Sequence, residues 1–315
     1  MQYYSRDSVE QSLSMSTAIQ LSKVAFELQS HGMVVQAVRN IIPSSDGKLM
    51  GTMPAYITNG KYAGFGLKSI VVDFSKENTS PSHVGTILLF DESNSSQISA
   101  VDASSITELR TAAASAWATH VLAPPEASRL AILGTGLQAR QHLLAMLEIR
   151  PIRQITVWGR NRIHTQHFED WCKEHTDAEI TSAATPSEAV READIICTVT
   201  AAKKPFLLKS DLPERCHINA VGASAIGFQE LDPEIYSDIE LYVDSRESSW
   251  SASQCLISAK EKGFIPHGYI IREIGEIEHI PGSPKSQIPK QTLFKSVGLA
   301  VQDLVFAREV IQQHQ

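Results

Sequence analysis

A glycine pattern in the middle of the chain has the spacing of a dinucleotide-binding turn. The apolar run Leu130–Leu133 leads directly into Gly134, and Gly136 and Ala139 follow two and five residues later. Apolar residues then recur at helical spacing, and a second apolar run lies at 155–158. In a strand, turn, helix and strand of this kind, the first glycine permits the tight turn and the second admits a pyrophosphate, while the small third residue lets helix and strand pack closely. We therefore expect a dinucleotide here, with its phosphates at the N–H groups that begin the helix.

The end of the second strand bears on which dinucleotide binds. An acidic residue at this position would bind a ribose 2′-hydroxyl. This chain has Gly159-Arg160-Asn161-Arg162 there, without a carboxylate, and two guanidinium groups suit a 2′-phosphate. The pattern favours NADPH over NADH, with NADH still possible; the alternative is a basic loop that only faces solvent.

Strands and helices alternate from about residue 130 to Leu241–Asp244, the last strand we expect, which predicts a parallel, doubly wound Rossmann-like sheet. Ligands bind at the carboxyl ends of such strands, so the segments ending at Thr200 and Gly222 are expected near the cofactor. Val221 could equally belong to the core of the sheet. The residues expected to bind the cofactor are Gly134, Thr135, Gly136, Leu137, Gln138, Ala139, Gly159, Arg160, Asn161, Arg162, Thr198, Val199, Thr200, Val221 and Gly222.

The segments before this repeat predict a smaller, mainly antiparallel sheet domain with a helix at Met15–Gly32. Leu293–Gln312 predicts a second amphipathic helix, which we expect to pack on the same sheet. The chain is thus expected to form an α/β fold with residues 1–117 and 294–315 in a substrate-binding and dimerisation domain, and residues 118–293 in an NAD(P)-binding domain. The strands expected in the smaller domain are 34–43, 49–57, 66–72, 84–91 and 98–101.

Three basic residues of the smaller domain could form an anion site. Arg39 interrupts an apolar segment, Lys68 lies within an expected strand, and Arg110 lies in a helix that is expected to begin with a capping box formed by Ser105 and Glu108. Each cation alone could face solvent, with its stem lying along apolar surface. Together they would suit a carboxylate, because Arg binds it bidentately and Lys adds a point charge.

Composition argues against several classes of protein. The net charge is −7 and no basic block stands out, which argues against a nucleic-acid surface. No apolar run approaches the roughly 20 residues that span a bilayer, and the N-terminus lacks the character of a signal peptide. The four cysteines form no CxxC pair and the 11 histidines no HxH or HxxxH pair, so we expect reduced thiols, no metal and a cytoplasmic protein.

The order of several motifs resembles the ornithine cyclodeaminase/mu-crystallin family over nearly the whole chain, and most closely its ketimine reductase branch. The resemblance implies a homodimer whose sheet domains associate, and a substrate carboxylate held by Arg39, Lys68 and Arg110. The motifs are Val38-Arg39, Met53-Pro54-Ala55-Tyr56, Lys68, Ser82-His83, Arg110-Thr111-Ala112-Ala113, Gly134–Ala139, His217–Ser224, Glu230-Leu231-Asp232 and Phe294–Gly298.

The same resemblance adds further site residues. Met53 is expected beside the substrate, and Lys68, Arg110 and His83 are the catalytic candidates. Ser82, His83, Arg110 and Ser296 are also expected to contact the cofactor. His83 is a candidate for the edge of the nicotinamide or for a proton relay, although a lone histidine is as often structural.

Two departures from the family pattern indicate the direction of the reaction. Cyclodeaminases carry an aspartate after the strand that ends at Gly222, where this chain has Ala223-Ser224-Ala225, and an acidic residue where it has Gly51. Oxidising an amine requires a base, whereas reducing a protonated imine does not. We therefore expect NAD(P)H-dependent reduction of a cyclic imino acid: Δ1-pyrroline-2-carboxylate to L-proline and Δ1-piperideine-2-carboxylate to L-pipecolate. The alternatives are an ornithine cyclodeaminase and a non-catalytic, NADPH-dependent small-molecule binder.

Overall fold

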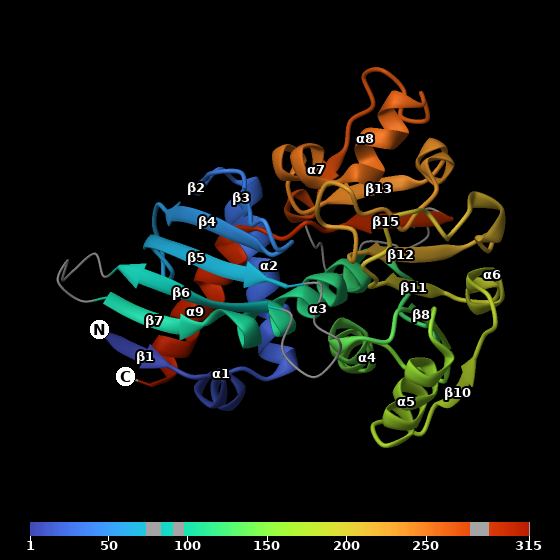
Figure 1. Cartoon of the computed structure of the whole chain (residues 1–315), viewed down its shortest axis with the longest axis horizontal. Coiled ribbons are helices and arrows are strands. Elements are labelled where there is room, and N and C mark those ends of the chain that lie inside the picture. The colour runs from blue at the N-terminus through green and yellow to red at the C-terminus, as the bar shows by residue number, and fades with distance from the viewer. Residues whose placement is uncertain (74–82, 91–97, 278–289, 315) are drawn as a thin grey trace. The chain divides into compact units, whose positions relative to one another are not determined.

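The computed structural model describes residues 1–73, 83–90, 98–277 and 290–314 (Figure 1). The chain divides into two compact units, which we call unit 1 (Met1–Arg110 with Gly298–Gln315) and unit 2 (Thr111–Val297). The sequence-based boundaries at 117/118 and 293/294 lie a few residues away from these. The boundary between Arg110 and Thr111 falls inside one continuous helix, α3 (Ala103–Leu122). The helical sequence of this segment contains no signal for a domain boundary.

Unit 1 is built on a sheet of seven described strands in the order β1-β7-β6-β5-β4-β2, with β3 also paired to β4. β1 and β7 are parallel, and the remaining pairs are antiparallel. The elements of this unit are β1 (Gln2–Tyr4), α1 (Arg6–Ser12), α2 (Met15–Ser30), β2 (Val34–Gln36), β3 (Asn40–Pro43), β4 (Leu49–Ile57), β5 (Gly64–Val72), β6 (His83–Phe90), β7 (Ile98–Asp102), the start of α3, and α9 (Ala300–Gln313).

The C-terminal helix α9 covers one face of this sheet. It packs against β4, β5, β6 and α2, and Figure 1 shows α9 and α2 on the same side of the strands. Buried residues alternate along β5, so that Gly66, Lys68 and Ile70 face the helix. A Cβ on Gly66 would lie 2.8 Å from the Leu304 side chain, so a glycine there allows α9 to approach the sheet closely. The expected packing of the C-terminal helix on the first sheet is confirmed.

Two expectations for unit 1 are wrong in detail. Residues 34–43 form two strands, β2 and β3, because both pair with β4 but leave residues 37–39 opposite Met53 and Pro54. Pro54 has no N–H to donate to a ladder, and the intervening segment, with Arg39, leaves the sheet there. The expected capping box is also wrong: α3 starts at Ala103, before Ser105. The carboxylate of Asp102 accepts the Ser105 N–H at 2.7 Å, while Glu108 pairs with Arg6 at 2.7 Å.

Unit 2 is a doubly wound α/β domain. Its eight described strands follow the order β10-β9-β8-β11-β12-β15-β13-β14, and every neighbouring pair is parallel. The expected Rossmann-like sheet is confirmed. Its elements are β8 (Arg129–Leu133), α4 (Leu137–Ile149), β9 (Gln154–Trp158), α5 (Arg162–Lys173), β10 (Glu179–Ser182), α6 (Pro186–Val190), β11 (Ile195–Thr198), β12 (Cys216–Ala220), β13 (Glu240–Val243), α7 (Arg246–Ala252), α8 (Gln254–Glu261), β14 (Arg272–Glu273) and β15 (Gln291–Lys295), together with the rest of α3.

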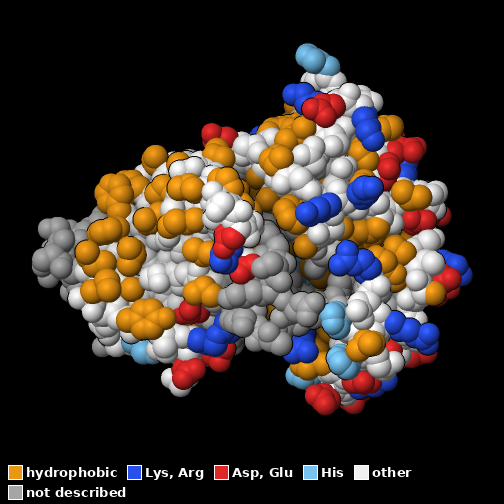
Figure 2. All heavy atoms as spheres, in the orientation of Figure 1, with side chains coloured by type: hydrophobic (Ala, Val, Ile, Leu, Met, Phe, Trp, Pro, Cys, Tyr) orange, Lys and Arg blue, Asp and Glu red, His pale blue; other side chains and the backbone are white. Residues whose placement is uncertain are grey.

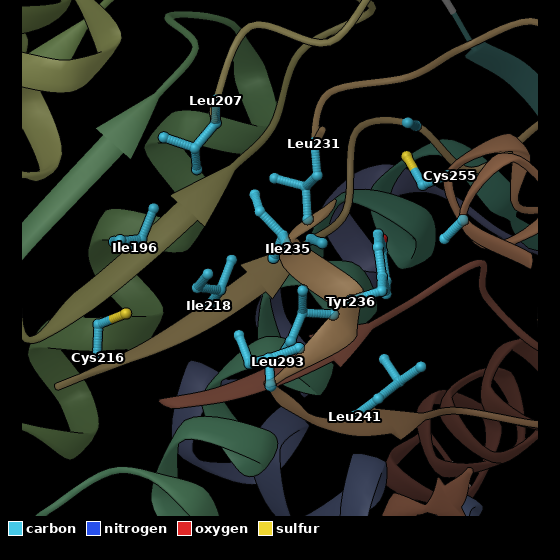
Figure 3. Packing of buried hydrophobic residues seen from close by; sticks show 14 of the residues in the cluster. Ile196, Leu207, Cys216, Ile218, Leu231, Ile235, Tyr236, Leu241, Cys255 and Leu293 are labelled. Carbon is cyan, nitrogen blue, oxygen red and sulfur yellow. The ribbon is translucent and has the colours of Figure 1, made fainter. Parts of the chain in front are cut away.

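The strand β15 corrects the prediction that Leu293–Gln312 is one helix and that Leu241–Asp244 is the last strand. Residues 291–295 lie between β12 and β13 in the sheet, with 292–295 buried, and α9 begins only at Ala300. A short apolar segment cannot be assigned to strand or helix from its periodicity, and here the parallel neighbours decide. Leu293 is fully buried beside Ile218 and Leu241 in the core shown in Figure 3.

Candidate functional site

The glycine turn after β8 has the geometry that a dinucleotide requires. Gly134 has φ +131°, a conformation that L side chains rarely adopt, and a Cβ there would lie 2.7 Å from the Val199 carbonyl oxygen. Its N–H donates to the Trp158 carbonyl at 2.8 Å, which fixes the turn. Gly136 is the N-cap residue of α4, and a Cβ on it would meet no atom within 4 Å. The start of α4 is therefore open to a phosphate group, and the residues present fit a dinucleotide.

The segment after β9 lies against the glycine turn. A Cβ on Gly159 would lie 2.6 Å from the Thr135 side chain and 2.7 Å from the Thr165 hydroxyl, so only glycine fits between them. Asn161 caps α5: its side-chain oxygen accepts the Ile163 and His164 N–H groups at 2.9 and 3.2 Å. Because Asn161 uses these two N–H groups itself, a 2′-phosphate at this position would depend on guanidinium groups.

Arg160 and Arg162 flank this cap, and both side chains are exposed. Their exposure leaves both interpretations made from the sequence open, a 2′-phosphate site and a solvated basic loop. Leu137, at the first position of α4, is 47% exposed.

The ends of β11 and β12 converge on Glu230, a carboxylate that the sequence reasoning missed. The Thr198 and Thr200 hydroxyls donate to it at 2.9 and 2.8 Å, so both hydroxyls are directed into the protein. Val221 is 6% exposed and its N–H donates to the Thr198 carbonyl, which places it in the core. The sequence held one signal for Glu230, its place in the motif Glu230-Leu231-Asp232, but no spacing rule that joins it to either threonine.

Ser296 follows β15 and is 2% exposed. Its hydroxyl donates to Asp244 at 3.2 Å, and the neighbouring Val297 N–H donates to the same carboxylate oxygen at 2.7 Å. Asp244 follows β13, so it ties the ends of two adjacent strands. Sequence reasoning named Ser296 but not this partner.

A buried charge cluster lies between the sheet and α9 in unit 1. Lys68 Nζ donates to Asp303 Oδ1 at 2.9 Å, and Arg110 Nε donates to the same oxygen at 3.3 Å. The exposed fractions are 2% for Lys68, 5% for Arg110 and zero for Asp303. Asp303 Oδ2 has no hydrogen-bond partner among the described residues. The structure thus brings together two of the three predicted cations on a carboxylate that was not predicted.

The environment of Lys68 makes it an unusual lysine. Burial lowers its pKa to about 7, and the positive charges of Arg110 and Arg39 also lower it, while Asp303 raises it. Arg39, which is half-buried, is therefore close enough to act on Lys68, and its Cδ lies 4.0 Å from the Cβ position of Gly51. Two cations share one oxygen of Asp303, and a third cation lies within electrostatic reach of Lys68, which suits an anionic ligand.

Gly298 and Met53 both lie beside this cluster. Gly298 has φ +83°, and a Cβ on it would lie 2.7 Å from Arg110 Nη1, so the guanidinium lies directly against the backbone. Met53 lies opposite Lys68 in the β4–β5 ladder and is 5% exposed, on the same face. This register places Met53 next to Lys68, and its expected place beside the substrate stays a prediction.

Two predicted residues cannot be placed in the same detail. Ser82 lies outside the described residues, and His83 begins β6 opposite Val72 with a side chain that is not described. Within the described ranges, no three His, Cys, Asp or Glu side chains gather in a way that could hold a metal ion. The same part of the chain contains no helix long and apolar enough to cross a membrane.

The sequence profile of the ornithine cyclodeaminase/mu-crystallin family matches residues 2–315. The ketimine reductase mu-crystallin of Macropus fuliginosus is 37% identical over 295 residues, 93% of this chain and 90% of that protein. The structure of Thermococcus litoralis Δ1-pyrroline-2-carboxylate reductase with NADH and L-proline aligns with a TM-score of 0.91 at 30% identity, covering 99% of this chain and 97% of that one. An archaeal alanine dehydrogenase dimer with bound NAD aligns with a TM-score of 0.89 at 26% identity, covering 99% and 95%.

The family profile spans both units and the positions of every motif on which the sequence resemblance was based. The profile covers far more than half of the chain, and the mu-crystallin relative is more than 30% identical across most of it. The chain belongs to the ornithine cyclodeaminase/mu-crystallin family.

Proposed function

We propose that this protein uses NADPH to reduce cyclic imino acids, converting Δ1-pyrroline-2-carboxylate to L-proline and Δ1-piperideine-2-carboxylate to L-pipecolate. Its similarity to a ketimine reductase and to a Δ1-pyrroline-2-carboxylate reductase makes it an NAD(P)H-dependent imino-acid reductase. Our proposal goes beyond this similarity in two respects, the ring size of the substrate and the preference for NADPH over NADH. The observation that carries the proposal is the pair of buried cations on Asp303, Lys68 and Arg110, with Arg39 within electrostatic reach of Lys68.

The cluster can bind the carboxylate of the imino acid. Arg110 is fixed at Nε by Asp303 and has further N–H donors for a ligand, which match the two oxygens of a carboxylate. Lys68 adds a point charge, and Arg39 lies within electrostatic reach of it. Because these groups are buried, their attraction for an anion is stronger than it would be in water.

The surrounding residues favour reduction over oxidation. The backbone segment after β12 carries Ala223, Ser224 and Ala225, and Gly51 lies on β4, so neither position supplies a carboxylate base. Removal of a proton from a substrate amine would need a base, and the two positions that carry a carboxylate in cyclodeaminases do not supply one here. A protonated cyclic imine needs only to be bound and oriented, which the cluster can do through its carboxylate.

Unit 2 would hold the cofactor. The start of α4 at Gly136 would take the pyrophosphate, and Arg160 and Arg162 would take the 2′-phosphate of NADPH. When bound, the reduced nicotinamide supplies the hydride that C2 of the imine accepts. Thr198, Thr200, Val221 and Ser296 would act by shaping the strand ends, since the three hydroxyls donate to Glu230 or Asp244.

Steady-state oxidation of NADPH with each cyclic imine tests the proposal. We expect turnover with at least one imine and a lower KM for NADPH than for NADH. Release of ammonia from L-ornithine in the presence of NAD⁺, without imine reduction, would identify a cyclodeaminase instead. Tight, NADPH-dependent binding of the imine without turnover would identify a binding protein.

We further propose that the outer face of the unit 1 sheet binds a second copy of the chain. Figure 2 shows apolar side chains gathered over β4, β5 and β6, on the face away from α9. Met50, Val71 and Val84 lie in line across these three strands and are 41%, 41% and 58% exposed. The archaeal alanine dehydrogenase that aligns over nearly the whole chain is a dimer.

Light scattering tests this proposed dimer. Val71→Glu should dissociate it into monomers, whereas Ile270→Glu, at a 77% exposed position of unit 2, should leave it intact.

A further inference from the structure

We propose that Glu230 is a positioning residue that joins the ends of β11 and β12 into one rigid surface for the nicotinamide half of the cofactor. The proposal depends on dinucleotide binding by unit 2, and it does not depend on which imine is reduced. It is carried by the convergence of two strand ends on one buried carboxylate.

Both oxygens of Glu230 are fully used. Oε1 accepts the Thr200 N–H at 2.6 Å and the Thr200 hydroxyl at 2.8 Å. Oε2 accepts the Thr198 hydroxyl at 2.9 Å and the Ala223 N–H at 3.1 Å. The side chain is completely buried, and no cation pairs with it among the described residues. Four neutral donors thus satisfy a charge that would be costly to bury alone.

The contacts around Gly222 show how closely the two strand ends are held. A Cβ on Gly222 would lie 2.1 Å from the Thr200 carbonyl oxygen and 2.5 Å from Glu230 Oε1. The backbone of Glu230 is itself fixed, because its carbonyl accepts the Phe206 and Leu207 N–H groups at 2.9 and 3.2 Å. A larger residue at position 222 would clash with the backbone at Thr200. Glu230 adds its side-chain bonds to the backbone bonds that the Val221 and Gly222 N–H groups donate to the Thr198 carbonyl.

These strand ends lie where the nicotinamide half of the cofactor is expected. In a doubly wound sheet the pyrophosphate lies at the first glycine turn and the adenosine ribose at the end of the next strand, here β8 and β9. The other half of the dinucleotide then extends across the switch point, towards β11 and β12. The Gly134 turn touches Val199 directly, so the surface held by Glu230 begins at the glycine turn.

Asp194 provides a matched control at the opposite end of β11. Its carboxylate also binds backbone N–H groups, those of Ser128 and Arg129 at 3.0 Å each, but at the amino ends of β8 and β11. Asp194→Asn weakens this tie between strands of the same sheet, together with the ion pair to Arg129, without touching the proposed surface. If Glu230 had only a structural role, Glu230→Gln and Asp194→Asn would change the affinities for the dinucleotide and for its nicotinamide-free fragment in the same way.

Calorimetric binding to Glu230→Gln and Asp194→Asn tests the proposal without turnover. The ligands are NADPH or NADH, whichever wild type binds more tightly, and the matching nicotinamide-free fragment, ADP-ribose 2′-phosphate or ADP-ribose. We expect Glu230→Gln to weaken the dinucleotide about tenfold and to leave the fragment within about twofold, because one amide cannot accept all four bonds. Asp194→Asn should leave both affinities unchanged.

Equal weakening of dinucleotide and fragment by Glu230→Gln, or no weakening of either, would overturn the proposal. If Glu230→Gln does not fold, Thr200→Val serves in its place, since it removes one bond to Oε1 and keeps the backbone N–H. The same selective loss of dinucleotide affinity is then expected, at a smaller size, and its absence would equally overturn the proposal. A failure of imine reduction with normal dinucleotide binding would count against the proposed reaction only.

Discussion

Asp303 in unit 1 and Glu230 in unit 2 are both completely buried carboxylates, but the donors around them differ. Asp303 accepts from two cations through one oxygen, and its other oxygen has no partner among the described residues. Glu230 accepts from four neutral donors through both oxygens. We expect Asp303 to keep Lys68 protonated and Glu230 to hold the ends of β11 and β12 at a fixed separation. A buried carboxylate with cationic donors thus affects protonation in this protein, whereas one with neutral donors fixes backbone geometry.

The largest effect is expected from removing a cation at Asp303. Arg110→Leu deletes the fork that we assign to the substrate carboxylate and should lower kcat/KM for the imine about 100-fold, or ~3 kcal/mol. Arg110→Lys keeps the charge without the fork and should lose less. Thermal unfolding of both variants controls for damage to the buried cluster. Equal kcat/KM in wild type and Arg110→Leu would remove Arg110 from the substrate site.

Asp303→Asn tests whether this carboxylate controls charge. Asp303 raises the pKa of Lys68 against burial and the charges of Arg110 and Arg39, which bring it to about 7. Only the charged lysine attracts an anion, so kcat/KM of wild type should fall as the pH rises through about 7. In Asp303→Asn the pKa of Lys68 is lower still, and the fall should move to lower pH, with about tenfold lower kcat/KM at pH 7. Superimposable pH profiles would contradict this role.

The exposed arginines of unit 2 should have a smaller, cofactor-specific effect. Replacing Arg160 and Arg162 together by Ala should raise the KM for NADPH by roughly fivefold and leave that for NADH nearly unchanged. NADH is the internal control, because it lacks the 2′-phosphate. An equal change for both cofactors would favour the solvated-loop interpretation.

The smallest effect is expected at Asp194, measured by urea unfolding. Burial raises the pKa of Asp194, but hydrogen bonds from Arg129 and from the Ser128 and Arg129 N–H groups outweigh it and lower the pKa below the usual value. Asp194→Asn should reduce the free energy of unfolding by about 1 kcal/mol near pH 7, since the Arg129 pair is partly exposed. A lowered pKa stabilises above the unfolded value, so wild type and variant should converge as the pH falls below about 4. A difference that persists in acid would contradict this account.

The sequence was most informative where local pattern and local structure coincide. The glycine turn, the parallel sheet and strands such as Leu49–Ile57 and Glu179–Ser182 follow from periodicity and turn residues alone. Lys68 and Arg110 could be singled out because a cation is unusual in an apolar strand and beside small residues. The carboxylate that joins them could not be, because Asp303 lies 193 residues after Arg110 and only the fold brings them together.

The wrong predictions also concern features that depend on contacts between distant segments of the chain. Residues 293–295, the end of β15, are predicted as helix because the identity of this strand depends on β12 and β13 as neighbours. The break between β2 and β3 depends on Pro54 in another strand. Thr198 and Thr200 were expected to face the cofactor, and only the position of Glu230 shows where their hydroxyls point.

The placement of α9 affects how the protein can be made. Unit 1 begins with residues 1–110, but the helix that covers its sheet and carries Asp303 is translated only after the whole of unit 2. Until α9 emerges from the ribosome, Lys68 and Arg110 have no anion from this helix, and the apolar face beneath it is uncovered. Unit 2 is completed only shortly before, because β15, which lies between β12 and β13 in its sheet, ends at Lys295 and α9 begins at Ala300. Both units therefore wait for the same last stretch of the chain before their sheets are fully packed.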